Sequence, residues 1–388
     1  MSNNHLITFN CEKQFYYFLI FWVLELVINL FNNLFPTEFL TIKISFNNID
    51  KNEEELENIK INELIIVLCK IFSELFAGIA NLCNNEPIIE NIKKDKKKFF
   101  YLMITSVFLI ICKSRNFLYY LFSESVKRLN DSEINWEIGL FIISTIIFCK
   151  YINKEITFYL HHKVSIVITL LAFIFMSSFD IYCLIKDKDI QISDKIINII
   201  IYTFFSIYYP FSHSVFKVLM NDFLPPIILT FWIGIFHSII LIIILPIFFF
   251  TKIIKLGEIE FDSVTFIIWI LIKICYIIFY FIRQLIIYII INKNNPAYMI
   301  FMISINSFIS FIAPFFVNKK DKEYKEPVFF IIFDCISLIL LSFAGLLFNE
   351  ILIVHKFGLD LKTKSSLKIK AVEEILGNEE DDRNTFVY

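Results

Sequence analysis

The chain alternates long apolar runs with short charged segments, and this pattern repeats ten times between Gln14 and His355. Residues 224–254 show it most clearly, because nearly every residue after Pro225 and Pro226 is apolar. A helix needs about 20 such residues to cross roughly 30 Å of hydrocarbon. The runs therefore predict ten membrane crossings, and a function carried out within or across a bundle of helices.

The composition agrees with this prediction. Of 388 residues, 57% are hydrophobic and 19% are charged, whereas soluble domains have about 45–50% and about 25%. The net charge is −2, and the sequence has no basic stripe with interleaved aromatic residues, so we expect no nucleic-acid partner. The eight cysteines are scattered, mostly in apolar runs, which favours small buried side chains over disulfides or a metal site. We expect no metal and no other cofactor.

The fold class that follows is all-α, a polytopic membrane protein with ten transmembrane helices. Only helices or closed barrels satisfy every backbone group in lipid, and long runs without alternation favour helices. Pro226, Pro296 and Pro327 stand where the seventh, ninth and tenth helices are expected to begin. The first run is longer than a signal-peptide core and is read as a retained span. The predicted spans are 14–36, 62–83, 98–122, 136–153, 162–185, 195–219, 224–251, 262–291, 296–317 and 327–355.

The distribution of lysines predicts the orientation of these spans. The short loop 84–97 is strongly basic and is placed in the cytosol, whereas the acidic loop 37–61 is placed outside. Asn130 begins the one glycosylation sequon, which falls in an expected outside loop. An even number of spans then puts both termini in the cytosol, as a short N-terminal segment (1–13) and a polar tail (356–388) typical of disorder. Plasma membrane and endomembrane both stay open.

Ten spans divide naturally into two five-helix repeats, residues 14–186 and 187–355. An odd number of helices in each half makes the two halves run in opposite directions through the membrane. This is the inverted-repeat design, in which a substrate binds near the midplane where the halves meet. The repeat is predicted here from the number and spacing of the spans.

Several short segments are similar to segments of a known family. They are residues 211–220 followed by Pro225-Pro226 and Gly234, Asn295-Pro296, Phe348-Asn349-Glu350, and His161-His162-Lys163. With the layout of spans, they resemble the drug/metabolite transporter superfamily, near the EamA-type and nucleotide-sugar-transporter-like branches and an uncharacterised eukaryotic branch. The resemblance implies a ten-helix inverted-repeat carrier of small organic solutes that works by alternating access without a cofactor. Nucleotide-sugar and triose-phosphate signatures are not visible, so the substrate class stays open.

Ionic residues inside the predicted spans are the main candidates for a substrate site. A charge at mid-bilayer costs at least about 2.5 kcal/mol, so it usually faces a partner or a water-filled cavity. The cations in the spans are Lys70, Lys113, Arg115, Lys273 and Arg283, and the acids are Glu25, Glu74, Asp180, Asp334 and Glu350.

The cations in the third and eighth spans point to an anionic substrate. Lys273 and Arg283 are separated by about 15 Å along one helix, so both can face one cavity at different depths. Lys273 is the leading candidate, whereas Arg283 alternatively reaches the inner interface. Lys113 and Arg115 do not share a helix face, so one is expected to bind and the other to reach the outer headgroups. The aromatic residues proposed to shape the pocket are Tyr276, Tyr280 and Trp232, with core packing as their default role.

The acids have simpler expected roles. Lys70 and Glu74 are four residues apart on one helix face, so mutual neutralisation is expected, although such a pair can open to admit an anion or a proton. Glu25 and Glu350 are expected to form interhelical hydrogen bonds, with Asn29 or Asn349 as nearby partners, and proton coupling is the alternative. Asp180 and Asp334 are placed near the interfaces.

The sequence therefore predicts a transporter of a small organic metabolite, with an anionic, nucleotide-sugar- or phosphosugar-like solute as the favoured class. Its partners are that solute and the lipid bilayer, and a homodimer is compatible with the sequence. The first alternative is a membrane scaffold or receptor-like protein that transports nothing. The second is a lipid-modifying enzyme, with His213 or His237 as the catalytic base. The sequence has no Gly-rich phosphate loop and no nucleophile elbow, and His161-His162 is a single adjacent pair, so no enzyme activity is expected.

Overall fold

The fold is described from a computed structural model of the chain. The described residues are 7–9, 13–34, 41, 44–45, 51–84, 92–93, 95–122, 136–154, 158–186, 192–255, 258–259, 263–294, 296–299, 328–361, 363 and 366–367. The predicted ninth span lies outside them beyond residue 299. The sequon at Asn130 and the tail from residue 368 onwards lie outside them as well.

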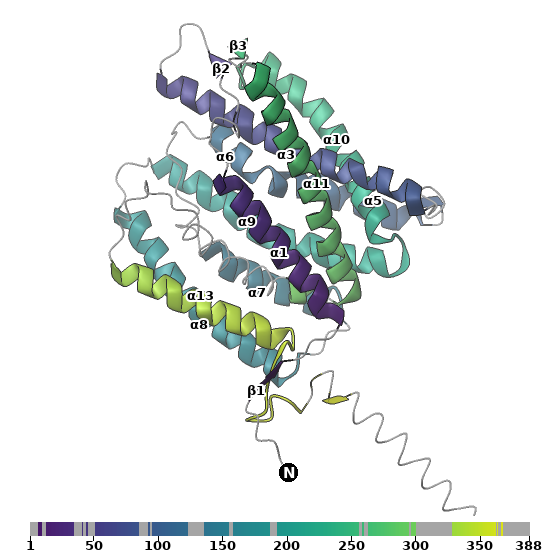
Figure 1. Cartoon of the computed structure of the whole chain (residues 1–388), viewed down its shortest axis with the longest axis vertical. Coiled ribbons are helices and arrows are strands. Elements are labelled where there is room, and N and C mark those ends of the chain that lie inside the picture. The colour runs from purple at the N-terminus through teal and green to yellow at the C-terminus, as the bar shows by residue number, and fades with distance from the viewer. Residues whose placement is uncertain are drawn as a thin grey trace, which may run out of the picture.

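The described part of the chain is mostly helical (Figure 1). Its helices are α1 (Lys13–Leu34), α3 (Lys51–Asn84), α5 (Lys96–Lys113), α6 (Arg115–Phe122), α7 (Trp136–Tyr151), α8 (Leu160–Lys186), α9 (Ile192–Asp222), α10 (Pro226–Phe250), α11 (Ser263–Lys293) and α13 (Val328–Phe348). Its strands are β1 (Ile7–Phe9), β2 (Ile44–Ser45), β3 (Glu258–Ile259) and β4 (Leu352–Val354). The expectation of a helical protein is confirmed, and helices lie over each predicted span that falls within the described residues.

By length and apolarity, three helical segments among the described residues can each cross a membrane. They are Ile199–Asp222, Pro226–Phe250 and Val264–Lys293. The pair Lys96–Lys113 and Arg115–Leu121 is a fourth candidate if the two pieces count as one bent span. Shorter apolar helices are Leu19–Ile28, Gly139–Tyr151, Leu160–Phe175 and Cys335–Phe348. The arrangement in ten spans stays a prediction.

The helices differ from the predicted spans in three places, each for a local reason. Helix α3 begins at Lys51, inside the expected outer loop, and acids in its first turn favour a helix N-terminus. The third predicted span is bent by 62° between α5 and α6. Ser114 sits at this break, and its hydroxyl donates to the Ile110 carbonyl at 2.7 Å, a contact that bends helices. Helix α13 ends at Phe348, and Glu350 adopts a left-handed turn with φ of 55°.

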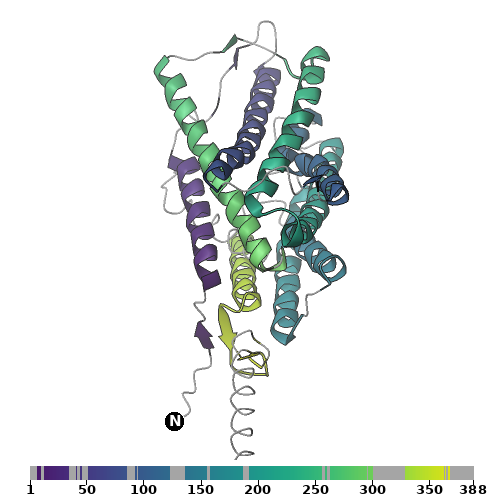
Figure 2. The same ribbon diagram turned by 90° about the vertical axis from the view of Figure 1, so that its right-hand side faces the viewer.

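Two short antiparallel ladders modify the all-α description. Strand β1 pairs with β4, and β2 pairs with β3. The first ladder joins the start of the described chain to the segment that follows α13, at the end of the molecule where Figure 2 shows both arrows. The second ladder links the segments that precede α3 and α11. Ladders this short were not visible as a pattern of alternating residues.

The turn after α10 is held to the start of α3 by polar contacts. The backbone N–H of Lys255 donates to Glu57 at 3.1 Å, and its ammonium contacts Glu53. The Glu53 carboxylate raises the pKa of Lys255 by hydrogen bonding to its charged form. The same Glu57 carboxylate accepts a hydrogen bond from Lys60 at 2.7 Å. Acidic residues of the expected outer loop therefore cap one end of the bundle.

The helices pack mostly against partners from the other half of the chain. Helix α3 lies between α10 and α11, as Figure 2 shows, and α8 lies along α13. Helix α9 contacts both α5 and α7, and α1 contacts α11. One apolar core joins α1, α5, α9, α10 and α11, and a second joins α7, α8 and α13.

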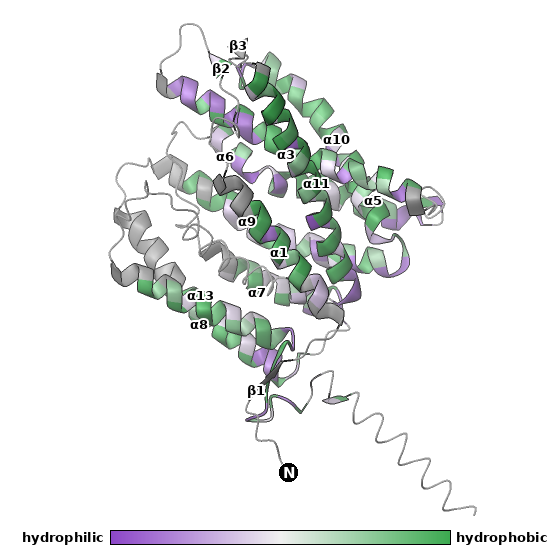
Figure 3. Cartoon of the chain, viewed as in Figure 1, coloured by the Kyte–Doolittle hydropathy of each residue, from purple (hydrophilic) through white to green (hydrophobic). Residues whose placement is uncertain are grey.

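The outer surface of the bundle is itself apolar. In α10, Ile242 is 71% exposed, Ile243 60% and Phe250 87%. Figure 3 shows the same character along most helices, with hydrophilic residues gathered on the first turns of α3. A helix that faces water normally carries polar residues on its outer side. An apolar outer surface on long helices is the character expected of a protein embedded in lipid.

Helices α3 and α10 approach each other closely at a glycine. A Cβ atom on Gly234 would lie 2.8 Å from the Cβ of Glu74 and 2.9 Å from the backbone nitrogen of Leu75. Backbone atoms cannot give way as a side chain can. The glycine therefore sets the distance between the two helices, one turn before His237.

Replacing Gly234 with alanine is expected to lower the thermal unfolding midpoint of the detergent-purified protein. The added methyl group must push α10 away from α3, and overpacking of this kind costs about 1–3 kcal/mol. Gly78→Ala is the matched control, because the three atoms nearest to its Cβ would all belong to the ring of Phe231, a side chain that can rotate. Alanine is the better helix former by about 1 kcal/mol, so the control is expected to be neutral or stabilising. Equal midpoints for the two variants would contradict the close contact.

Candidate functional site

Two groups of buried or half-buried ionic side chains connect different helices in the described part of the chain. The first, here called the central cluster, consists of Glu25, Lys70, Glu74, Lys113, His237 and Arg283, from α1, α3, α5, α10 and α11. The second consists of His161, His162 and Glu350, at the start of α8 and the end of α13. Both groups join helices that lie far apart in the sequence.

Glu74 is the most heavily engaged residue of the central cluster. Its side chain is almost fully buried, and one carboxylate oxygen forms an ion pair with Lys113 of α5. The other oxygen lies 2.7 Å from Nδ1 of His237 in α10. Mutual neutralisation of Lys70 and Glu74, the simplest expectation from their spacing, is therefore wrong. The partners of Glu74 come from neighbouring helices because its side chain points across the α3–α10 contact.

Both ring nitrogens of His237 face oxygen atoms. Nδ1 contacts Glu74, and Nε2 lies 2.9 Å from the backbone carbonyl oxygen of Ser106 in α5. A carbonyl oxygen only accepts hydrogen bonds, so Nε2 carries a hydrogen. The side chain has no solvent exposure. Three helices, α3, α5 and α10, therefore meet at this imidazole.

Lys70 is held differently from the other cations. Its ammonium donates to the backbone carbonyl of Lys113 at 3.2 Å and lies 6.0 Å from the ring centre of Tyr280. Among the described residues, no carboxylate forms an ion pair with it. A partly buried ammonium with these contacts is less fully compensated than one that forms an ion pair.

Glu25 and Arg283 join the first helix to α11. The carboxylate of Glu25 is 8% exposed and forms an ion pair with the guanidinium of Arg283. The guanidinium also lies 5.8 Å from the ring centre of Phe21. Glu25 therefore makes a direct interhelical contact with α11, and Arg283 faces α1.

The remaining cations of the predicted site face aromatic rings. Arg115 lies 5.0 Å from Tyr202 and 4.5 Å from Phe205, both in α9, so it points into the bundle and not to the headgroups. Lys273 is buried and lies 5.6 Å from Trp269 and 5.3 Å from Tyr276 on its own helix. Tyr276 stacks on Tyr280 with ring centres 5.9 Å apart, which leads from Lys273 towards Lys70.

The centre of the bundle carries an excess of positive charge. Lys113 is close enough to feel repulsion from both Lys70 and Arg283, and Lys70 also from Arg115. Four cations therefore share this region with three carboxylates. The cations are Lys70, Lys113, Arg115 and Arg283, and the carboxylates are Glu25, Glu63 and Glu74.

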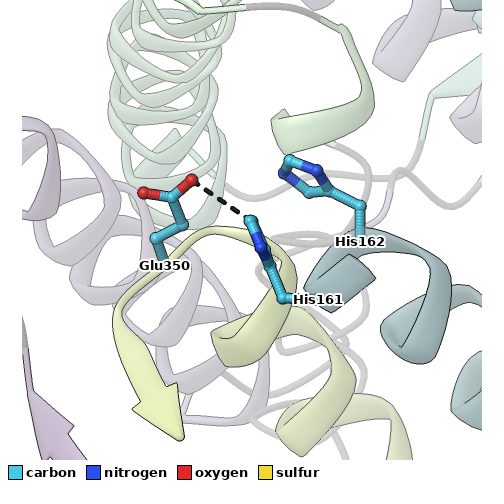
Figure 4. Close-up of side chains that lie close together, drawn as sticks. All are labelled: His161, His162 and Glu350. Atoms are coloured by element: carbon cyan, nitrogen blue, oxygen red, sulfur yellow. Dashed lines mark ion pairs between the residues drawn. The ribbon is translucent and has the colours of Figure 1, made fainter. Parts of the chain in front are cut away.

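The second group brings together residues that are far apart in the sequence (Figure 4). His161 and His162 stand in the first turn of α8, and Glu350 follows α13. Nε2 of His161 lies 3.2 Å from Glu350, and all three side chains are buried. The predicted interhelical role of Glu350 is met by His161 and not by Asn349, whose amide donates to the Gly345 carbonyl.

These three residues offer ligand atoms within 4.8 Å of one another, as a small metal site would. Nδ1 of His162, however, accepts a hydrogen bond from the backbone N–H of Tyr159 at 3.1 Å. A neutral imidazole that accepts at Nδ1 carries its hydrogen on Nε2, so neither nitrogen of His162 presents a lone pair to a metal. The positive end of α8 also favours the Glu350 carboxylate over a cation. The arrangement therefore fits an ion pair that ties α8 to α13 better than it fits a metal centre.

Sequence reasoning identified the ions but missed one member of the central cluster. From the sequence, His237 is a candidate only for the alternative enzyme activity. Its place in an apolar helix, three residues after a glycine, is the sequence signal for its membership of the central cluster. The side chains of Asp180 and Asp334 lie outside the described residues.

We expect the Glu25–Arg283 pair to be strongly coupled. Arg283→Met removes the guanidinium beside a buried carboxylate and should lower the free energy of unfolding by about 3–5 kcal/mol. The double variant Arg283→Met with Glu25→Gln should lose less free energy of unfolding than the two single variants added together. In the double variant both charges of the pair are gone, so neither is left buried without the other. Thermal or denaturant unfolding in detergent measures all four proteins.

Lys293→Met is the control for that cycle. It lies on the same helix, and its ammonium contacts the hydroxyl of Tyr17 in α1 at an exposed position. Exposed polar contacts contribute little, so this variant should stay within about 1 kcal/mol of the unmodified protein. Additive single and double variants would show that Glu25 and Arg283 act independently.

No family model matches this chain, and no curated protein matches it. Its function is therefore argued from the geometry of the central cluster.

Proposed function

We propose that this chain is a membrane carrier that moves a small organic anion by alternating access. In this proposal ten spans form two inverted five-helix halves, and the anion binds between them at the central cluster. Lys70 is the residue that most directly supports it. The proposal keeps the resemblance to the drug/metabolite transporter superfamily as its structural template.

The pattern of helix contacts supports an inverted repeat. If the halves are exchanged, the contact of α1 with α11 corresponds to that of α9 with α5, and both are present. The contact of α3 with α11 likewise corresponds to that of α10 with α5. The pairs α3–α10 and α8–α13 map onto themselves. A chain without a two-fold relation between its halves has no reason to repeat these pairings.

The β1–β4 ladder supports an even number of crossings. It places the start of the chain beside the segment that follows α13. Two segments that pair lie on the same side of a membrane, and only an even number of spans returns the chain to its starting side. Ten spans with both termini in the cytosol satisfy this condition.

The charge at the centre favours an anionic solute. Desolvating an ammonium is costly unless an opposite charge approaches it, and the direct contacts of Lys70 among the described residues are a carbonyl and a ring, with Glu63 acting on it only at Coulomb range. An entering phosphate or carboxylate would neutralise the excess positive charge. The stacked rings of Tyr276 and Tyr280 offer apolar faces for the organic part of the solute. A sugar phosphate or a nucleotide sugar combines these two features.

A scaffold that transports nothing is the second candidate. The ion pairs Glu25–Arg283 and Glu74–Lys113 favour it, because paired charges can serve stability alone. A pure scaffold, however, gains nothing from Lys70 and would be more stable with an apolar residue there. An enzymatic base at His237 is disfavoured, since both ring nitrogens already have partners.

Anion binding is tested by thermal shift of the purified protein with glucose 6-phosphate, UDP-glucose and malate, against glucose and uridine as neutral counterparts. We expect at least one anion, and neither neutral solute, to raise the unfolding midpoint. Lys70→Met should lower the affinity for that anion about tenfold or more, because hydrogen bonds to charged groups contribute about 1.5–3 kcal/mol. Uptake of the same radiolabelled anion into proteoliposomes should fall in parallel.

Lys97→Met is the matched control, since Lys97 is an exposed cation in the first turn of α5. It should bind and transport as the unmodified protein does. Lys273→Met separates the two lysine candidates: the larger loss identifies the lysine that meets the anion. A protein that binds none of the anions, or binds them equally well without Lys70, contradicts the proposal.

A further inference from the structure

We propose that Glu74 and His237 bind the proton that this carrier moves together with its anion. The inference rests on the carrier function proposed above and adds the coupling ion and its place. It is carried by the geometry of one imidazole and one carboxylate between α3 and α10.

The positions of the heavy atoms require a hydrogen between the two groups. Nε2 of His237 already donates to the Ser106 carbonyl. A neutral imidazole then has a lone pair on Nδ1, and an ionised carboxylate has only lone pairs. These two acceptors would repel each other at the observed 2.7 Å. A proton must therefore lie on Nδ1 or on the Glu74 oxygen, and either location gives one titratable proton at a site without solvent exposure.

The surroundings of this proton are positive. Lys113 from α5 contacts Glu74 directly, while Lys70 from α3 and Arg283 from α11 lie within Coulomb range of Lys113. From α9, His213 lies within Coulomb range of Lys113 and Arg283. Glu25 of α1 neutralises Arg283, so the carboxylate nearest to the proton is Glu74 itself. An added proton thus enters a region that already has an excess of cations.

Proton and anion therefore favour each other. An anion at Lys70 lowers the positive potential at Glu74 and His237, which strengthens proton binding there. By linkage, the bound proton strengthens anion binding by the same factor. A proton that enters together with the anion offsets one unit of its negative charge, so the pair moves less net charge than the anion alone.

The proton also joins the two proposed halves. Glu74 and Ser106 belong to α3 and α5 of the first half, and His237 belongs to α10 of the second. When the proton leaves, two acceptors face each other across the α3–α10 contact, beside the close approach at Gly234. The contact must then open. Proton release on one side of the membrane is in this way tied to movement of one half against the other.

The proton itself is tested first, without any solute. In purified protein with ring-labelled histidine, nitrogen NMR should show His237 with hydrogen on both ring nitrogens. If the proton lies on Glu74, infrared spectra should instead show a carboxylic acid band. His237→Gln removes the first signal while keeping a donor for the Ser106 carbonyl, and Glu74→Gln removes the second while keeping a hydrogen bond to Nδ1. Absence of both signals from about pH 5 to pH 9 would overturn the proton site.

Coupling is tested in proteoliposomes that contain a pH-sensitive dye. A pulse of external glucose 6-phosphate, UDP-glucose or malate, whichever binds, should acidify the lumen. Glu74→Gln and His237→Gln should abolish acidification and reduce accumulation of that anion against its gradient at least tenfold, while the anion still binds in the thermal-shift assay, with an affinity lowered by the loss of the linked proton. Ser238→Ala, next to His237 and bonded only to the Gly234 carbonyl of its own helix, should acidify normally.

The outcomes separate the two proposals. Anion uptake without proton movement overturns the coupling and leaves the carrier intact. Failure of every anion to bind or enter overturns the carrier function, and the coupling with it, while the spectra still decide whether the pair holds a proton. Equal acidification by the unmodified protein and both glutamine variants places the coupling elsewhere and contradicts the inference.

Discussion

The placement of Glu74 inside an apolar bundle is the constraint on which the central cluster depends. A carboxylate in such surroundings needs partners on both oxygens, and Lys113 and His237 supply them from two other helices. The glycine at 234 lets α10 come close enough to α3 for this to happen. Packing and charge therefore both place Glu74 at the same point of the α3–α10 contact. The proposed function rests on two features of this region, the additional cation Lys70 and the proton proposed to be shared by Glu74 and His237.

Much of the fold could be predicted from hydrophobicity alone. A run of apolar residues specifies a helix in lipid without reference to its neighbours, so the described helices fall where the sequence placed them. The differences occur where local chemistry decides. Acids lengthen the start of α3, Ser114 marks the bend between α5 and α6, and the turn at Glu350 ends α13 early. The two ladders depend on distant pairings and left no local signal.

The candidate site could be predicted as a set of residues but not as a set of contacts. Spacing suggested that Lys70 would neutralise Glu74, because both lie on one helix face. The carboxylate of Glu74 instead contacts Lys113 of α5 and His237 of α10. These partners are set by the packing of three helices, which the sequence of one helix does not predict. For the same reason, the contacts of Glu350 with His161 and of Arg283 with Glu25 could not be predicted, because these residues are far apart in the sequence.

The central claim is that the ionic side chains within the apolar helices face a shared, water-accessible path. It is tested most directly by placing a cysteine at Lys70, in a background without native cysteines, and measuring its reaction with a small hydrophilic thiol reagent in the membrane. Ile242, which is 71% exposed on the outer face of α10, is the lipid-facing control. The account predicts that Lys70→Cys reacts from water, while Ile242→Cys is inert. Reaction at neither position, or the same reaction at both, would contradict it.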